Sequence, residues 1–433
     1  MRGARRPGGQ LPALAVPPHE DRAAHHRHQA WDGRVDGRRV PPEGPRPHVL
    51  PRAVRRPHGD RAVVSGQPLG RAGDGGTWLP AFADAHVHLG LADPVAVRRG
   101  GIAVVHDLGW VPDVARTWPG RSDFPEVAFA GAFLTAPGGY PSDRSWAPPG
   151  SVAEVATPDD AVAAVDRQVA AGASFLKVTL HADAGPVLDD VTLTALVGHA
   201  HARGRDVVAH VEGRGMAARA VEAGVDRLAH APFSERLPDD LLAAMARPRA
   251  VEHDLARGRV RGNCRDEPDN DSNPVLGGAG GRTAGRSRTT WVSTLDIHGW
   301  GSPTAEQDVA IDNVRRFVAL GGTVVYGTDL GNGPIPHGVD ERELRALAAA
   351  GLDAPALLGA LTREAAHPRA ADGVDDLDDH VERPRRASPA TWIPGDPPDP
   401  DDLDAVCAWL ARAVVVDDPA RAQRAPAIPE DRP

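Results

Sequence analysis

Two histidines that could bind a metal ion, His86 and His88, lie two positions apart in the segment DAHVHLG. The apolar residues around them predict a buried strand, and side chains two positions apart on a strand project from the same face. The chain has 19 histidines, so one such pair is expected by chance. The pair alone is therefore weak evidence for a metal site.

Three further residues of ligand type end apolar runs elsewhere in the chain: His210, His230 and Asp329. Imidazole and carboxylate groups are the ligands expected for zinc or a similar divalent ion. If these runs are parallel strands of one barrel, their carboxyl ends meet at the face where catalytic groups gather. Together with the histidine pair, these residues predict a metal site.

Lys177 is the one lysine in a chain with 49 basic residues, and it lies in another apolar run. A protonated ammonium would be repelled by divalent cations, but a neutral lysine amine can add carbon dioxide and become a carbamate whose two oxygens bridge two cations. Arginine cannot lose its proton and cannot do this. The isolated lysine therefore predicts a carbamylated Lys177 and a site with two divalent ions. The types of ligand in this site favour zinc.

Short apolar runs alternate with amphipathic stretches from residue 78 onward. Buried strands separated by helical patterns of this kind indicate βαβ units, and eight of them favour a closed (β/α)8 TIM barrel, expected over residues 78–365. The expected strands are 79–91, 101–110, 126–135, 174–182, 206–213, 226–233, 289–299 and 322–332, and the expected helices are 159–171, 189–203, 214–223, 237–246, 304–320 and 340–350.

Three segments show neither the alternation of a strand nor the period of a helix: an Arg- and Pro-rich segment at 1–77, an insertion at 247–288 within the barrel, and residues 364–390. Their amino-acid composition resembles that of a polypeptide translated from GC-rich DNA in a wrong reading frame. Inspection of the other two reading frames would test that hypothesis. The C-terminal segment 366–433 regains a pattern over 391–416. The two terminal segments therefore predict only a small, incomplete β-sandwich beside the barrel.

The formal net charge of −10 argues against nucleic acid as a partner. The sequence contains no run of about 18 apolar residues, the length that a membrane-spanning helix needs. The two cysteines, Cys264 and Cys407, have no metal-ligand spacing and fit a reducing cytoplasm. We expect a cytoplasmic protein that acts on a small-molecule substrate, and a homo-oligomer is a further expectation.

The order His-x-His, Lys, His, His, Asp on expected strands one, four, five, six and eight resembles the binuclear amidohydrolase superfamily. The segment LPAFADAHVHLGL resembles the opening segment of that family, and AGVDRLAHAPF and GGTVVYGTDLG resemble its sixth- and eighth-strand motifs. These motifs are most like the imidazolonepropionase- and prolidase-related branch. The resemblance covers roughly residues 78–246 and 289–365.

The resemblance implies a buried ion and a more exposed ion, held respectively by His86, His88 and Asp329 and by His210 and His230. Carbamylated Lys177 and a hydroxide would bridge the two ions. The hydroxide would attack a carbonyl, and Asp329 would move its proton to the leaving amine. Lys177 and Asp329 are therefore the expected catalytic residues.

The implied reaction is hydrolysis of an amide-type C–N bond in a cyclic amide, an N-acyl amino acid or a dipeptide. The matching enzyme class is the hydrolases that act on C–N bonds other than peptide bonds. An esterase, lactonase or phosphotriesterase on the same two metals is the alternative enzyme, and a non-catalytic or defective metal-binding homologue is the alternative from another class.

Four further residues are candidates to contact the substrate. Tyr140 could polarise a carbonyl or hold a carboxylate, and Glu212 could bind an ammonium or orient His210. His181 and His106 end or flank strands and could line the pocket. For each of them, a supporting or loop role is the alternative.

Overall fold

The computed structural model describes residues 70–72, 75–247, 289–365 and 389–417. Every described residue belongs to one compact unit of the chain, within residues 63–433. Most of the three segments predicted to be irregular lies outside the described residues.

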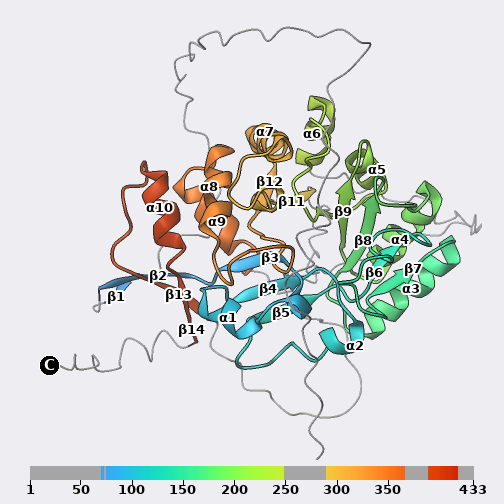
Figure 1. Ribbon diagram of the computed structural model, residues 1–433, viewed down its shortest axis with the longest axis horizontal. Coiled ribbons are helices and arrows are strands. Elements are labelled where there is room, and N and C mark those ends of the chain that lie inside the picture. Colours follow the sequence, from blue (N-terminus) through green and yellow to red (C-terminus); the bar gives the residue numbers. More distant parts are fainter. Residues whose placement is uncertain (1–69, 73–74, 248–288, 366–388, 418–433) are drawn as a thin grey trace, which may run out of the picture. The chain divides into compact units, whose positions relative to one another are not determined.

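Eight short parallel strands, or strand pairs, follow one another through the barrel (Figure 1). They coincide with the eight apolar runs of the sequence, so the prediction of eight strands is confirmed. Their bounds are β3 (Ala83–Val87), β4 (Val104–Asp107), β5 (Glu126–Phe129) with β6 (Phe133–Thr135), β8 (Leu176–His181), β9 (Val207–Glu212), β10 (Arg227–Leu228), β11 (Thr290–Val292) and β12 (Thr323–Val325).

Hydrogen bonds join these strands into a closed ring. One sheet has the order β12-β11-β10-β9-β8-β6-β7, where β7 (Val152–Glu154) pairs with the other edge of β6, and a second has the order β3-β4-β5. The ring closes between β3 and the end of β12, where Ala85 N–H donates to Tyr326 O (3.0 Å) and His88 N–H donates to Leu330 O (2.7 Å). All strands point the same way, so their carboxyl ends share one face of the barrel.

The third expected strand, 126–135, is interrupted in the middle. β5 pairs with β4, whereas β6 pairs with β8. Gly131 adopts φ +77° at the interruption, and a Cβ there would lie 2.1 Å from Gln168 Oε1. That oxygen accepts a hydrogen bond from Ala132 N–H (2.9 Å). A buried amide from the following helix thus satisfies the backbone where the ladder is broken.

The six predicted helices are present, and the described residues form four others. Thr157, Asp189, Thr304 and Asp340 each cap a helix N-terminus by accepting a backbone N–H bond. The bounds are α1 (Pro94–Arg99), α2 (Pro112–Ala115), α3 (Pro158–Ala170), α4 (Asp190–Ala202), α5 (Met216–Glu222), α6 (Asp239–Ala246), α7 (Ala305–Ala319), α8 (Glu341–Ala349), α9 (Ala354–Thr362) and α10 (Leu403–Leu410), with 3-10 turns η2 (Leu89–Leu91) and η3 (Asp296–His298).

An antiparallel sheet of order β1-β2-β13-β14 draws strands from both sides of the barrel sequence: β1 (Gly70–Ala72), β2 (Gly76–Pro80), β13 (Ala390–Pro394) and β14 (Val414–Val416). It corresponds to the small domain predicted from the terminal segments. The expected barrel start at residue 78 is wrong, because that residue lies inside β2 and pairs with Trp392 of β13. Residues 70–72 and 76–77 also form strands in a segment where the sequence predicted none.

An apolar layer fills the barrel interior directly below its carboxyl-terminal face. Leu108, Ala130, Phe175, Val208 and Ala229 form one buried cluster. Side chains alternate between the two faces of a strand, so Phe175 and Val208 share their inner face with residues two positions further on, Lys177 and His210. The polar site therefore lies next to a packed apolar layer. No helix in the described part of the chain is long and apolar enough to cross a membrane.

Glu343 on α8 is a buried carboxyl group with a strongly altered acidity. Burial raises its pKa to about 8, against the hydrogen bonds it accepts from backbone groups such as Asp296 N–H (2.8 Å). A raised pKa in the folded state adds stability that is fully present below the unfolded pKa and is lost as pH rises through the folded value.

We therefore expect Glu343→Gln to remove part of the pH dependence of stability. The free energy of unfolding of the parent protein should fall between pH 5 and pH 8 by up to about 4 kcal/mol more than that of the variant. Urea unfolding at several pH values measures this difference. Parallel curves for the two proteins would show that Glu343 is ionised in the folded state.

Candidate metal centre

His86, His88 and Asp329 converge at the carboxyl-terminal end of the barrel. Asp329 Oδ1 lies 3.1 Å from His86 Nε2 and 3.2 Å from His88 Nε2. All three residues are buried, and their ligand atoms all lie within 4.8 Å of one another. The structure thus brings together the three residues expected to hold the more buried ion.

Hydrogen bonds from the other ring nitrogens orient both imidazoles. His86 Nδ1 lies 2.8 Å from Ala229 O, and His88 Nδ1 lies 3.3 Å from Gly109 O. A ring that donates its Nδ1–H to a carbonyl must present Nε2 as the lone-pair nitrogen. Both Nε2 atoms therefore face Asp329 in the form that a cation binds.

Asp84, at the start of the same strand as His86, fixes the distance between β3 and the end of β12. Its Oδ1 accepts hydrogen bonds from His86 N–H (3.0 Å) and Thr328 N–H (3.1 Å), and its Oδ2 accepts one from the Thr328 hydroxyl (2.6 Å). Asp329 N–H donates to His86 O (2.8 Å). These bonds hold the ligands on two strands in one register.

The three residues meet a simple test for a cation site. Within the described residues, no hydrogen bond reaches His86 Nε2 or Asp329 Oδ1, although both atoms are buried. Leaving buried polar atoms unpaired costs roughly 1–3 kcal/mol each. Two imidazole nitrogens and a carboxylate oxygen are also the donor set that zinc prefers. The residues present therefore fit a divalent ion.

The charge states of the buried group suit a cation as well. Burial lowers the pKa of His86 well below its usual value, with a further contribution from Lys177, so its imidazole is neutral. Burial by itself raises the pKa of Asp329, but His86 and His88 more than offset this, and the carboxyl stays ionised. Metal ligands must be deprotonated, and these are.

His230, at the end of β10, lies between the buried group and His210. Its ring centroid is 4.6 Å from that of His86 and 4.9 Å from that of His210. Its Nδ1 lies 2.9 Å from the hydroxyl of Thr294, which leaves Nε2 for a ligand. The structure thus places His210 and His230 side by side, as expected for a second ion.

Lys177 is among the largest fully buried side chains, with 1% of its surface exposed. Burial lowers the pKa of its amine to about 7, although Asp329 and Asp107 act in the opposite direction. Its charge in turn lowers the pKa of His86 and His230. The lysine therefore lies close to both expected ion positions and is partly neutral near pH 7, as carbamate formation requires.

A second group of ligand-type residues lies at the ends of β8 and β9. Glu212 Oε2 is 3.3 Å from both His181 Nδ1 and His210 Nε2. Tyr140 covers this group, with its ring 5.2 Å from that of His210 and 4.9 Å from that of His181. The three residues expected at the substrate therefore meet around His210.

His106 does not line the site, so that expectation is wrong. Its Nδ1 lies 3.0 Å from the guanidinium of Arg227, and its ring packs on Phe175. Arg227 also pairs with Glu364 (2.9 Å). The histidine lies in the barrel interior on the other side of the apolar layer, since Phe175 precedes Lys177 on the same strand face.

Sequence reasoning missed several residues that support the ligands. Asp107 accepts hydrogen bonds from Leu89 N–H (2.8 Å) and Gly109 N–H (3.2 Å), which shapes the loops on both sides of His88. Asn332 donates to Asp329 Oδ2 (2.9 Å). An acidic residue inside an apolar run, as at Asp107, was the available signal, because buried carboxylates need partners.

Backbone strain also marks the site. Asp329 has φ +57° and Thr294 has φ +42°. A β-branched residue such as threonine is a rare occupant of the left-handed region. Strained residues of this kind gather at functional sites, where the surrounding structure holds them in place.

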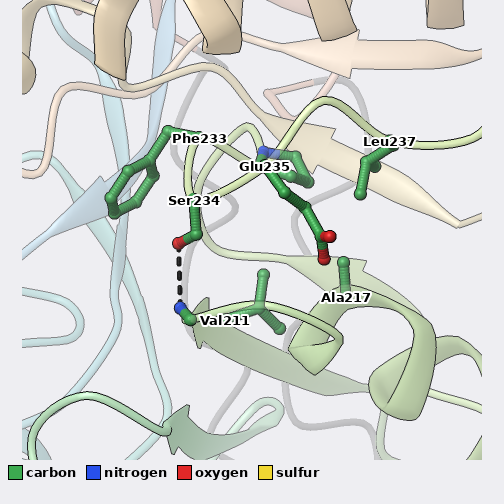
Figure 2. A pocket seen from close by; sticks show the side chains of 8 residues that line it. Val211, Ala217, Phe233, Ser234, Glu235 and Leu237 are labelled. Carbon is green, nitrogen blue, oxygen red and sulfur yellow. Dashed lines mark hydrogen bonds between the residues drawn. The ribbon is translucent and has the colours of Figure 1, made fainter. Parts of the chain in front are cut away.

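Figure 2 shows a small cavity on the opposite side of β9, lined by Val211, Ala217 and Phe233 among others. Its volume is about 10 Å³, room for at most about one water molecule. Val211 alternates with His210 and Glu212 along the strand, so the cavity lies outside the barrel interior. It holds no substrate.

The cavity marks a junction between the loops that follow β9 and β10. Ser234 Oγ accepts a hydrogen bond from Gly213 N–H (2.8 Å), the dashed line in Figure 2. Glu235 Oε1 accepts one from Gly215 N–H (2.6 Å). Ser234 and Glu235 follow His230 in the chain. The junction therefore fixes the end of β9, which carries His210, relative to His230.

No family model matches the chain. Uncharacterised proteins of Mycobacterium tuberculosis (strain ATCC 25618 / H37Rv) and Mycobacterium bovis are each 27% identical over 334 residues, which cover 72% of this chain and 80% of the relative.

Solved structures with a similar fold include a Xaa-Pro dipeptidase with bound methionine (TM-score 0.53, 18% identity, 77% of this chain and 84% of the other). Ochratoxinase from A. niger (TM-score 0.53, 16% identity, 78% and 81%) and an amidohydrolase (TM-score 0.52, 18% identity, 78% and 85%) are two others. The described part of this chain therefore has the fold of amidohydrolase and dipeptidase structures, as its sequence motifs predicted.

Proposed function

We propose that this chain is a metal-dependent hydrolase of the amidohydrolase superfamily that cleaves an amide-type C–N bond. The observation that carries the proposal is the convergence of His86, His88 and Asp329, whose buried ligand atoms face one another at the barrel face where catalytic groups gather. The amidohydrolase and dipeptidase folds among the similar structures support it.

One divalent ion would be held by the buried group of His86, His88 and Asp329 and the other by the His210–His230 pair, with carbamylated Lys177 between them. The donor types in both places favour zinc. Bound there, the two ions would supply Lewis-acid chemistry, polarising a carbonyl and lowering the pKa of water to about 7. The burial of Lys177 supports the carbamate: its neutral amine adds carbon dioxide, forming an N–C bond and releasing one proton.

Asp329 is the group that moves protons in this proposal. Its carboxylate stays ionised, so it can accept the proton of an attacking water and give it to the leaving nitrogen. Asn332 holds Oδ2 in place by donating to it (2.9 Å). Because this hydrogen bond holds the carboxylate in one orientation, the group needs little reorientation between the two proton transfers.

Tyr140, His181 and Glu212 would receive the substrate. Burial raises the pKa of Tyr140, so its phenol stays protonated and can donate a hydrogen bond to a carbonyl oxygen. A dipeptide or an N-acyl amino acid offers such a carbonyl next to charged termini, and a cyclic amide is the smaller variant. The Xaa-Pro dipeptidase fold favours the dipeptide.

A substrate screen tests this function directly. Zinc-loaded protein should hydrolyse members of a panel of dipeptides, N-acyl amino acids and cyclic amides, and His88→Asn prepared in parallel should not. Turnover of lactones, esters or phosphotriesters alone would show that the enzyme cleaves another kind of bond. Binding of zinc without turnover of any class would identify a non-catalytic homologue.

A further inference from the structure

We propose that His181, His210 and Glu212 form a cation-binding position of their own, separate from the buried group and from the His210–His230 pair. The cation would be a divalent ion of the zinc type. This inference rests on the metal-dependent function proposed above. It assigns His210 a second set of partners, drawn from β8 and β9 instead of β10.

Two of the three ligand-to-ligand distances within the group match those around a tetrahedral ion, and the third is no more than 4.8 Å. Ligands about 2.0–2.1 Å from a tetrahedral zinc lie about 3.3–3.4 Å from one another. Glu212 Oε2 lies 3.3 Å from His181 Nδ1 and 3.3 Å from His210 Nε2. In the buried group, the corresponding distances from Asp329 Oδ1 to the two histidines are 3.1 and 3.2 Å.

The neighbouring strands hold these three residues together through their backbones. β8 and β9 are parallel, and His181 pairs with Glu212 while Thr179 pairs with His210. His210 and Glu212 alternate on β9 and therefore share a strand face. The position is thus formed by two adjacent strand ends and does not depend on a long loop.

Burial within the group is graded from the barrel interior outwards. The side chains of His210, His181 and Glu212 are 11%, 12% and 16% exposed, against 1% for His86. His210 Nε2 is itself buried and makes no hydrogen bond to any described residue. Three protein ligands with an open fourth position are typical of ions that exchange or contact a substrate.

The location places this ion nearer the barrel mouth than Lys177. His181 follows Lys177 by four residues on the same strand, which corresponds to about 13 Å along it. The ring of Tyr140 packs on both histidines from the loop after β6. An ion here would lie on the path of the substrate. His210 could not be a full ligand of this ion and of an ion beside His230 at the same time.

Cobalt binding to the metal-free, full-length protein tests the proposal without relying on activity. Equilibrium dialysis gives the affinity of each equivalent of Co²⁺, and visible absorption reports its ligands. We expect the parent protein to bind a third, weakest equivalent beyond the two of the proposed function, and Glu212→Gln and His181→Asn each to weaken this third equivalent at least about tenfold and to change its spectrum. The tightest equivalent, at the buried group, should stay unchanged in both variants.

Glu222→Gln, on helix α5, is the matched control and should bind Co²⁺ like the parent protein. The proposal is overturned if both Glu212→Gln and His181→Asn bind the third equivalent as the parent does, or if the parent binds only two equivalents. Loss of the third equivalent in His230→Asn alone would assign it to the His210–His230 pair and overturn the proposal as well. Absence of even the tightest equivalent would instead refute the proposed function.

Discussion

Lys177→Ala should lose hydrolytic activity by about a thousandfold or more, because it removes the group proposed to join the two ions and hence several kcal/mol of transition-state stabilisation. The variant should also retain less zinc than the parent protein. Lys177 is buried, but its loss removes a desolvated amine, so we expect a folded variant. Metal content, circular dichroism and turnover measured on one preparation check these outcomes.

Two comparisons separate the carbamate from other roles of Lys177. Lys177→Arg keeps the positive charge but cannot become a carbamate, so it should be as defective as the alanine variant. Short carboxylic acids such as acetate or propionate should partly restore zinc binding and activity to Lys177→Ala, because a carboxylate can take the place of the carbamate. An active Lys177→Arg variant would contradict the proposed role.

The acidity of Lys177 gives the carbamate a pH dependence. The pKa of its amine is lowered to about 7, largely by burial. Carbon dioxide adds only to the neutral amine, which is the major form above this pKa and the minor form below it. Metal-free protein should therefore take up its full complement of zinc more readily at pH 8 than at pH 6 when bicarbonate is supplied.

Asp329→Asn should lower kcat by about 10²- to 10⁴-fold, the usual contribution of a general acid–base group. The asparagine keeps the shape of the side chain but cannot accept a proton at neutral pH. Because Asp329 Oδ1 is the atom shared by His86 and His88, the variant should also bind the more buried ion more weakly. Steady-state kinetics at saturating zinc separates the two effects.

Asn332→Ala is the control for Asp329. It removes the hydrogen bond that holds Oδ2 without changing the candidate ligand atom Oδ1. We expect activity to fall by about 10- to 100-fold, the usual effect of losing a hydrogen bond to a metal ligand. A kcat for Asp329→Asn within tenfold of the parent value would mean that another group moves the proton.

The eight strands and the grouping of the candidate ligands could be predicted from the sequence because both depend on local patterns. Apolar runs of strand length between helical periods identify buried parallel strands, and the candidate ligands stand at the ends of those runs. The interruption of the third strand was not predictable in this way. It depends on Gly131 and on an amide, Gln168, that reaches it from α3.

The supporting residues were missed for a related reason. Asp84 and Thr294 act through partners 244 and 64 residues away, and no spacing in the sequence records such pairs. His106 was misplaced because its position along β4 fixes its distance from the carboxyl-terminal face, which only the strand register reveals. Glu212 was expected to assist His210, but its contact with His181 required the pairing of β8 with β9.

The most direct test of the account is the number of metal ions bound to the folded chain. Protein loaded with zinc in the presence of bicarbonate and then freed of excess metal should retain about two ions per chain, and Lys177→Ala should retain fewer. A folded chain that binds no zinc under these conditions would contradict the two-ion hydrolase at the centre of this account.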